Sequence, residues 1–281
     1  MRITIRYEGA PGKGHGHRIR MERLAKVLRQ RGADVNIGPA NFVEILDTLK
    51  RHSQDVLVMD VSFNDNKELE VFRPFVKKLV VMVGVGYSIN TETTWIADAV
   101  IYQSLASHGF VDRAPGSACM HGGNWLLVDP LSHQMKLPAD QLGMIVMSYF
   151  GAGFSDDYSD AVETELVRLI GPNVQQTGGA DTWMIDWSRR VAQARLVVTS
   201  MGMAAYEALA VGTHVVAVSV DEEHAGDAGA VPLIKHAGLW NEVSPEQVAA
   251  LAAETYDAVL MRPRAPIDAM GVYRLARFLL E

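Results

Sequence analysis

Glycine and histidine alternate over residues 14–17, directly after the first predicted strand and before the first predicted helix. A glycine-rich turn at a helix start leaves backbone N–H groups open to a ligand, and these groups together with the helix dipole favour an anion. The side chain of a histidine such as His17 can also accept a proton near neutral pH. The pattern therefore predicts an anion site combined with proton transfer, at the edge where α/β folds bind ligands.

This turn does not match the common phosphate or metal motifs. The glycines of residues 9–16 do not give the G-x-G-x-x-G spacing of dinucleotide-binding folds, and the Gly-Lys pair among them lacks the following Ser or Thr of a P-loop. His15 and His17 are two residues apart, which in an extended turn places them on opposite sides, and no Cys or His cluster accompanies them. We therefore expect neither a metal nor a dinucleotide cofactor here.

A second turn, Ser200-Met201-Gly202-Met203, follows a predicted strand and opens a predicted helix. The N-terminal amides of that helix can bind a diphosphate. Glu207 lies about one turn further along, where a carboxylate can accept hydrogen bonds from paired ribose hydroxyls. The alternative is a helix cap with a solvated glutamate. A third turn, with Gly151 and Gly153, can also direct N–H groups at phosphate.

The strands and helices that would position these turns alternate along the whole chain. The alternation of apolar and polar residues at 3–7 predicts a strand, and the continuous apolar run at 55–60, which ends in Asp60, predicts a buried parallel strand. The strand pattern restarts near residue 143, after a stretch with two prolines, so we expect two Rossmann-like α/β domains, residues 1–135 and 136–281. Expected helices include 20–31, 42–50, 158–170, 202–211, 232–236, 245–256 and 273–280.

The composition, 48% hydrophobic and 21% charged, is typical of a globular protein. The net charge of −7 argues against broad affinity for nucleic acids. Six basic residues between 18 and 31 leave a local basic groove open as an alternative to a solvated helix face. A single cysteine, Cys119, fits a reducing compartment, and no apolar run has the length of a membrane span. We expect a cytoplasmic protein.

Several segments resemble one family, in the same order along the chain. Residues 14–20 resemble the G-x-G-H-x-x-R motif that opens the UDP-sugar hydrolase of pseudaminic acid biosynthesis and its spore-coat polysaccharide relatives. Residues 55–60 are similar to the family's strand ending in aspartate, and 122–128 to its G-x-x-Y-x-x-L segment, with Trp125 at the tyrosine position. Residues 200–212 resemble the nucleotide-binding segment shared with MurG-like glycosyltransferases.

This resemblance implies a GT-B fold, in which two Rossmann-like domains with parallel sheets face a central cleft. It implies an enzyme that acts on a nucleotide-activated sugar, with UDP as the expected nucleotide and the second domain as its main binding site. His17 would be the general base of an inverting reaction that needs no metal or other cofactor. The same resemblance implies that Gly14, Gly16, Arg20 and Asp60 contact the substrate and that Gly151, Ser200, Gly202, Met203 and Glu207 bind the nucleotide.

The activity has alternative forms. Transfer and hydrolysis use the same base and differ in whether the acceptor is a hydroxyl compound or water. The sequence departs from the family pattern at residues 149–153, at Asp129 and at residues 221–224. In the family these positions tend to contact the sugar or the diphosphate. The departures therefore favour transfer, to an acceptor that the sequence does not define. A non-catalytic nucleotide-sugar-binding subunit, from another class, would not need a base at His17. A Rossmann oxidoreductase is opposed by the missing dinucleotide fingerprint.

Overall fold

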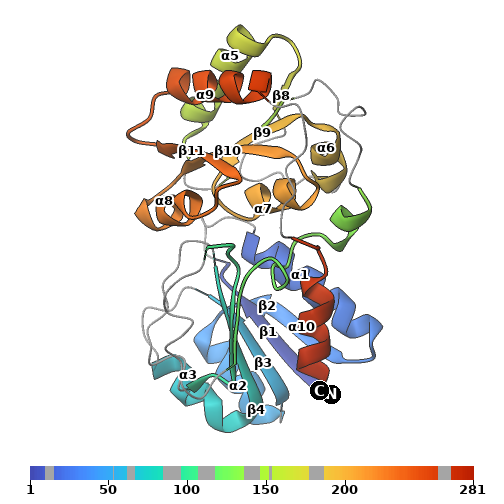
Figure 1. Ribbon diagram of the computed structural model, residues 1–281. Coiled ribbons are helices and arrows are strands. Elements are labelled where there is room, and N and C mark those ends of the chain that lie inside the picture. The colour runs from blue at the N-terminus through green and yellow to red at the C-terminus, as the bar shows by residue number, and fades with distance from the viewer. Residues whose placement is uncertain are drawn as a thin grey trace. The chain divides into compact units, whose positions relative to one another are not determined.

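The computed structural model describes residues 1–9, 16–52, 54–61, 67–84, 96–106, 118–135, 146–151, 154–176, 187–258 and 267–281. The chain forms two compact units, and their elements are labelled in Figure 1. Unit 1 comprises Met1–Pro11, Gly16–Leu127 and Met270–Glu281, and unit 2 comprises Gly12–His15 and Val128–Ala269.

Unit 1 is built on a parallel sheet of six strands in the order β2-β1-β3-β4-β5-β6. The strands are β1 (Arg2–Tyr7), β2 (Asp34–Pro39), β3 (Gln54–Asp60), β4 (Val76–Val83), β5 (Ala99–Tyr102) and β6 (Ala118–Met120). The helices are α1 (Gly16–Gln30), α2 (Phe42–Arg51), α3 (Lys67–Phe72), η1 (Arg73–Phe75) and α10 (Gly271–Leu280). In the register of β1 and β3, Tyr7 lies opposite Asp60, so the carboxyl ends of these two strands are adjacent.

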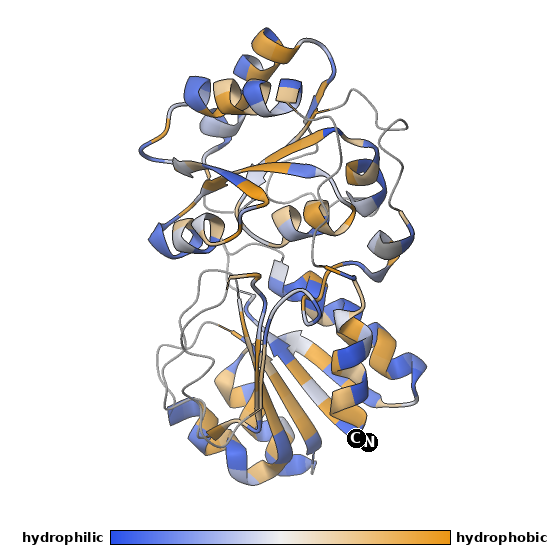
Figure 2. Ribbon diagram, in the orientation of Figure 1, coloured by the Kyte–Doolittle hydropathy of each residue, from blue (hydrophilic) through white to orange (hydrophobic). Residues whose placement is uncertain are grey.

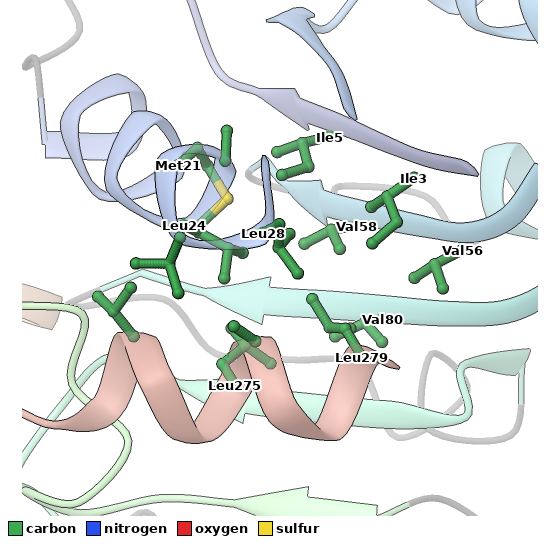
Figure 3. Packing of buried hydrophobic residues seen from close by; sticks show 14 of the residues in the cluster. Ile3, Ile5, Met21, Leu24, Leu28, Val56, Val58, Val80, Leu275 and Leu279 are labelled. Atoms are coloured by element: carbon green, nitrogen blue, oxygen red, sulfur yellow. The ribbon is translucent and has the colours of Figure 1, made fainter. Parts of the chain in front are cut away.

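Both faces of the unit 1 sheet are buried. On one face, Ile3 and Ile5 of β1 pack in a cluster with α1 and α10, and Figure 3 shows Leu275 of α10 pointing toward Leu24 of α1. The opposite face packs against α2 and α3. Figure 2 shows the resulting pattern, with apolar strands and helices that alternate between apolar and polar residues. Burial on both faces explains the continuous apolar run at 55–60.

Unit 2 is built on a parallel sheet of five strands in the order β11-β10-β9-β7-β8. The strands are β7 (Val146–Tyr149), β8 (Val174–Gln176), β9 (Leu196–Ser200), β10 (His214–Ser219) and β11 (Ile234–Leu239). The helices are η3 (Pro130–Gln134), α5 (Asp156–Ile170), α6 (Trp187–Gln193), α7 (Met203–Ala210), α8 (Glu222–Gly229) and α9 (Pro245–Ala258). The prediction of two Rossmann-like units with parallel sheets is therefore confirmed.

The limits of the units differ from the expected division between residues 135 and 136. The continuous part of unit 1 ends at Leu127, and the last helix, α10, returns to unit 1. Leu275 and Leu279 lie on the apolar side of this helix and are fully buried against the first sheet. An amphipathic helix must bury its apolar side somewhere, but its sequence does not specify which sheet receives it.

Gly271 allows α10 to start close to the backbone of residues 125 and 126. A Cβ at this position would lie 2.9 Å from the carbonyl carbon of Trp125 and closer still to the carbonyl oxygen of Leu126. We expect Gly271→Ala to cost about 1–3 kcal/mol of stability, the usual range for overpacking, and to lower the thermal midpoint. Gly226→Ala is the control, because a Cβ there would meet no atom within 4 Å. Equal midpoints for the two variants would contradict this prediction.

Two local predictions require correction. Residues 232–236 do not form the expected helix, since Ile234–Leu239 is strand β11. The open edge of β10 provides backbone hydrogen-bond partners that outweigh the weak helical preference of a short segment, and pairing proceeds through a register shift between Ala217 and Val218. Helix α1 starts at Gly16 instead of residue 20, which places His17 in its first turn. No helix in the described ranges is long and apolar enough to cross a membrane.

Candidate active site

The candidate base, His17, meets the end of strand β3. Helix α1 packs on the same face of the sheet as Val56 and Val58, and Asp60 follows them at the period of two residues that keeps side chains on one face. His17 lies at the start of α1 and Asp60 at the carboxyl end of β3, so the fold brings together two residues that are 43 positions apart.

His17, Arg20 and Asp60 form a hydrogen-bonded cluster. The Nδ1 atom of His17 lies 3.0 Å from Oδ1 of Asp60 and 3.2 Å from its backbone oxygen. Arg20 donates from Nε to Oδ2 of Asp60 at 2.6 Å and from Nη2 to Oδ1 at 2.5 Å. This two-pronged pairing is the strong geometry between a guanidinium and a carboxylate. Asp60 is fully buried and Arg20 nearly so, whereas the His17 side chain keeps 12% of its surface exposed.

Asp60 is held in its ionised form. Burial alone would raise the pKa of its carboxyl group, but the charges and hydrogen bonds of Arg20 and His17 outweigh burial and lower the pKa below the ordinary value of aspartate. At neutral pH the cluster therefore presents an ionised carboxylate to the Nδ1 side of the imidazole.

The carboxylate can fix the tautomer of the histidine. With the proton on Nδ1, His17 donates to Asp60, and Nε2 keeps the lone pair that a general base needs. Nη2 of Arg20 also lies 3.0 Å from Nδ1, a distance that suits the opposite tautomer, in which Nδ1 accepts the hydrogen bond. Only the first tautomer makes Nε2 basic. The arrangement can thus hold a base at the start of α1 and stabilise it when it takes up a proton.

The structure places the other expected substrate contacts of unit 1 as follows. Arg20 and Asp60 are both buried and hydrogen-bonded to each other and to His17, an arrangement that can position the histidine, and their contact with a substrate stays a prediction. Gly16 begins helix α1 and is partly exposed. Gly14 lies outside the described residues. No group of three or more His, Cys, Asp or Glu side chains that could hold a metal ion occurs in the ranges that the structure describes.

The expected nucleotide-binding residues of unit 2 gather at the carboxyl ends of β7 and β9. The two strands are parallel neighbours, with Tyr149 opposite Thr199. Immediately after them, the backbone N–H of Gly151 donates to Oγ of Ser200 at 3.3 Å. A Cβ at residue 151 would lie 3.4 Å from this Oγ atom, an ordinary van der Waals distance. The turns that follow β7 and β9 therefore meet at Gly151 and Ser200.

Helix α7 starts at the same edge and has an N-terminus suited to an anion. Its N-cap residue, Gly202, supplies no side chain to the first-turn amides, which begin with the N–H of Met203. Helix α8 differs, because the carboxylate of Asp221 caps it and Glu222 and Glu223 occupy its first turn. The acidic stretch at 221–224 is thus a helix start, and an Asp followed by two Glu residues is the sequence signal for it. A diphosphate fits α7 and not α8.

Glu207 lies on α7 but is fully buried. Its neighbour across the helix–sheet interface is Tyr149, whose pKa is raised to about 12 by burial and then by the negative charge of Glu207. Tyr149 in turn packs against Trp187, with ring centroids 5.2 Å apart. The solvated glutamate considered from the sequence is therefore excluded, and the contact with a ribose stays a prediction.

Comparisons with known proteins identify the fold. No protein-family model and no curated protein matches the sequence. Among solved structures, the chain is similar to Acinetobacter baumannii MurG, with a TM-score of 0.64, 11% identity and 99% of each chain covered. It is also similar to Methanocaldococcus jannaschii UDP-GlcNAc 2-epimerase in complex with UDP-GlcNAc and UDP, with a TM-score of 0.66 and 9% identity over 100% of this chain and 99% of that one.

A third similar structure is Anabaena HepE in complex with UDP, with a TM-score of 0.52 and 13% identity over 100% of this chain and 96% of that one. At such identities the likeness establishes the architecture. The chain has the GT-B fold, and in structure it resembles the nucleotide-sugar enzymes built on that fold.

Proposed function

We propose that the protein is a GT-B glycosyltransferase that moves a sugar from a UDP-sugar to an acceptor hydroxyl, with His17 as general base. The observation that carries the proposal is the contact of His17 with the buried, ionised Asp60 at the start of α1. The similar structures that contain UDP or UDP-GlcNAc support the donor class.

In this proposal, residues of unit 1 accept the proton that the acceptor hydroxyl loses. Nε2 of His17 takes the proton of the acceptor hydroxyl as the oxygen bonds to the anomeric carbon of the sugar. The positive charge that forms on the imidazole is stabilised by Asp60, which is 3.0 Å from Nδ1. Attack from the side opposite the leaving group inverts the anomeric centre.

In this proposal, residues of unit 2 stabilise the leaving group. The bond between the anomeric carbon and the diphosphate oxygen breaks, and its electron pair stays on the UDP. In our proposal the first-turn amides of α7 and the turn of Gly151 and Ser200 stabilise that added charge, without a metal ion. Glu207 accepts hydrogen bonds from the ribose.

Hydrolysis of the UDP-sugar is the second candidate, because water can replace the acceptor without any other change in the site. The resemblance of residues 14–20 to a UDP-sugar hydrolase motif favours it. A non-catalytic subunit is the third, but it gives no role to a base held by a buried ion pair.

Thermal unfolding with a panel of nucleotides tests the donor class. We expect UDP and UDP-sugars to raise the thermal midpoint, because a ligand that binds only the folded state stabilises it by about 2.7 kcal/mol at a hundred times its dissociation constant. Glu207→Gln, which keeps the shape of the side chain, should reduce this increase, whereas the matched change Glu163→Gln on α5 should not. Mass spectrometry of the products with and without acceptors separates transfer from hydrolysis. A midpoint that no nucleotide changes would refute the proposal.

A further inference from the structure

The two units carry opposite net charges, which the total of −7 conceals. By sequence, unit 1 contains 17 Lys and Arg residues against 14 Asp and Glu, whereas unit 2 contains 9 against 19. Such an asymmetry between parts of one chain is typical of a protein with an anionic partner for its basic part. The question is where the positive charge of unit 1 is exposed.

Helix α1 carries one group of the exposed cations of unit 1. Its outward residues Arg18, Lys26 and Arg29 fall within one sector of the helix, given 3.6 residues per turn, and extend over about 16 Å at 1.5 Å per residue. Arg31 is exposed directly after the helix ends. We call these four residues the α1 basic face. Arg20, by contrast, is buried with Asp60 and does not belong to it.

Several other exposed cations of unit 1 are neutralised locally. Arg51 pairs with Asp47 at 2.7 Å, and Lys77 pairs with Asp55 at 2.8 Å. On α1 the single carboxylate is Glu22, which approaches Arg18 only to 3.8 Å. Helix α1 therefore supplies little negative charge of its own to balance its cations.

Within the described ranges, Lys26, Arg29 and Arg31 have no carboxylate within ion-pair distance. Arg29 donates from Nη2 to the backbone oxygen of Val35 at 2.9 Å, which leaves its charge uncompensated by any anion. Three neighbouring cations without counter-charges repel one another, so an anion that lies across them is bound favourably.

The chemistry of the face fits a chain of phosphate groups better than a lipid surface. Three of the four cations are arginines, whose planar guanidinium groups pair with phosphate oxygens through two hydrogen bonds. Stable attachment to a membrane needs an apolar anchor in addition to basic residues. None of the exposed large apolar side chains in the described part of the chain comes from α1.

We propose that the α1 basic face binds the phosphodiester backbone of a nucleic acid and that a hydroxyl group of this polymer, on a ribose or on a hydroxylated base, is the acceptor of the sugar. The inference rests on the proposed function, because it gives the acceptor a chemical class. His17 is the second residue of α1 and Arg18 is the third. A nucleic-acid strand that lies along the α1 basic face therefore reaches the candidate base. The negative total charge limits this affinity to one local and salt-sensitive surface.

Fluorescence anisotropy with a labelled single-stranded and a labelled duplex DNA, measured over a series of salt concentrations, tests the proposal. The test variant is Lys26→Gln/Arg29→Gln/Arg31→Gln. The control, Lys50→Gln/Arg51→Gln/Lys77→Gln, removes the same charge from exposed positions elsewhere in unit 1. The wild type should bind with an affinity that falls as salt rises. The plot of log affinity against log salt has a negative slope. In the test variant the magnitude of this slope should be smaller by about two, at roughly 0.7–0.9 for each phosphate group that the variant no longer neutralises.

The control variant should keep the slope of the wild type. Absence of salt-dependent binding by the wild type, or equally weakened binding by the two variants, overturns the proposal. Preferential binding to vesicles of phosphatidylcholine and phosphatidylglycerol overturns it in favour of a lipid surface. The increase in thermal midpoint caused by UDP is also measured, on the wild type, the test variant and the control variant. Failure to bind DNA with UDP stabilisation intact rejects only this inference, whereas the absence of UDP stabilisation rejects the proposed function.

Discussion

Replacement of His17 by Asn is expected to lower turnover by about 10²–10⁴-fold, the usual contribution of a general base, while UDP binding is nearly unchanged. The reason is that Asn cannot take up the proton of the acceptor. The nucleotide, in our proposal, binds to unit 2 and does not depend on this side chain. Turnover is measured by product formation and UDP binding by the thermal midpoint, and His17→Ala should behave in the same way.

His52→Asn provides the matched control, because His52 is exposed and lies outside the cluster, at the end of α2. This variant should retain wild-type turnover. If His17→Asn also retained it, the base would have to be another group. If His17→Asn instead lowered both turnover and the increase in thermal midpoint caused by UDP, His17 would act in UDP binding.

Asp60→Asn is expected to have the second large effect, on stability as well as on turnover. The substitution leaves the buried guanidinium of Arg20 without a counter-charge, which in buried ion pairs costs about 3–5 kcal/mol. It also removes the negative charge that stabilises a protonated His17. Chemical unfolding should therefore show a lower free energy of unfolding, and the residual folded enzyme should turn over more slowly.

A second variant separates the two effects of Asp60. In Asp60→Asn/Arg20→Met the unpaired charge is gone, so stability should recover in part while turnover should not. Asp47→Asn is the control, since its partner Arg51 is exposed and surface pairs contribute little. Full recovery of turnover in the double variant would show that Asp60 does not act through His17.

Stability should also depend on pH in a direction set by Asp60. Its pKa in the folded protein is below the ordinary value of aspartate, so ionised Asp60 stabilises the fold at pH values above that ordinary value. This contribution disappears as the pH falls through the lowered pKa. Asp60→Asn should therefore lose less stability than the wild type on acidification, as measured by unfolding at a series of acidic pH values.

The local elements and the candidate turns could be predicted from the sequence without any structure. Alternation of strand patterns with helical patterns was enough to predict two parallel α/β units, because side-chain periodicity is encoded in neighbouring residues. It was also enough to select His17 and Ser200 at strand-to-helix turns. Residues 232–236 mark the limit of such prediction, since an available strand edge outweighed local preference.

Which distant residues meet could be learned only from the folded chain. Strand order places β3 beside β1, and this brings the buried Asp60 into contact with His17. Packing assigns α10 to unit 1 and buries Glu207 beside Tyr149. Local sequence cannot specify these contacts, because each depends on the register and burial of elements tens of residues away. The chain supplies the reactive side chains, and long-range packing selects their partners.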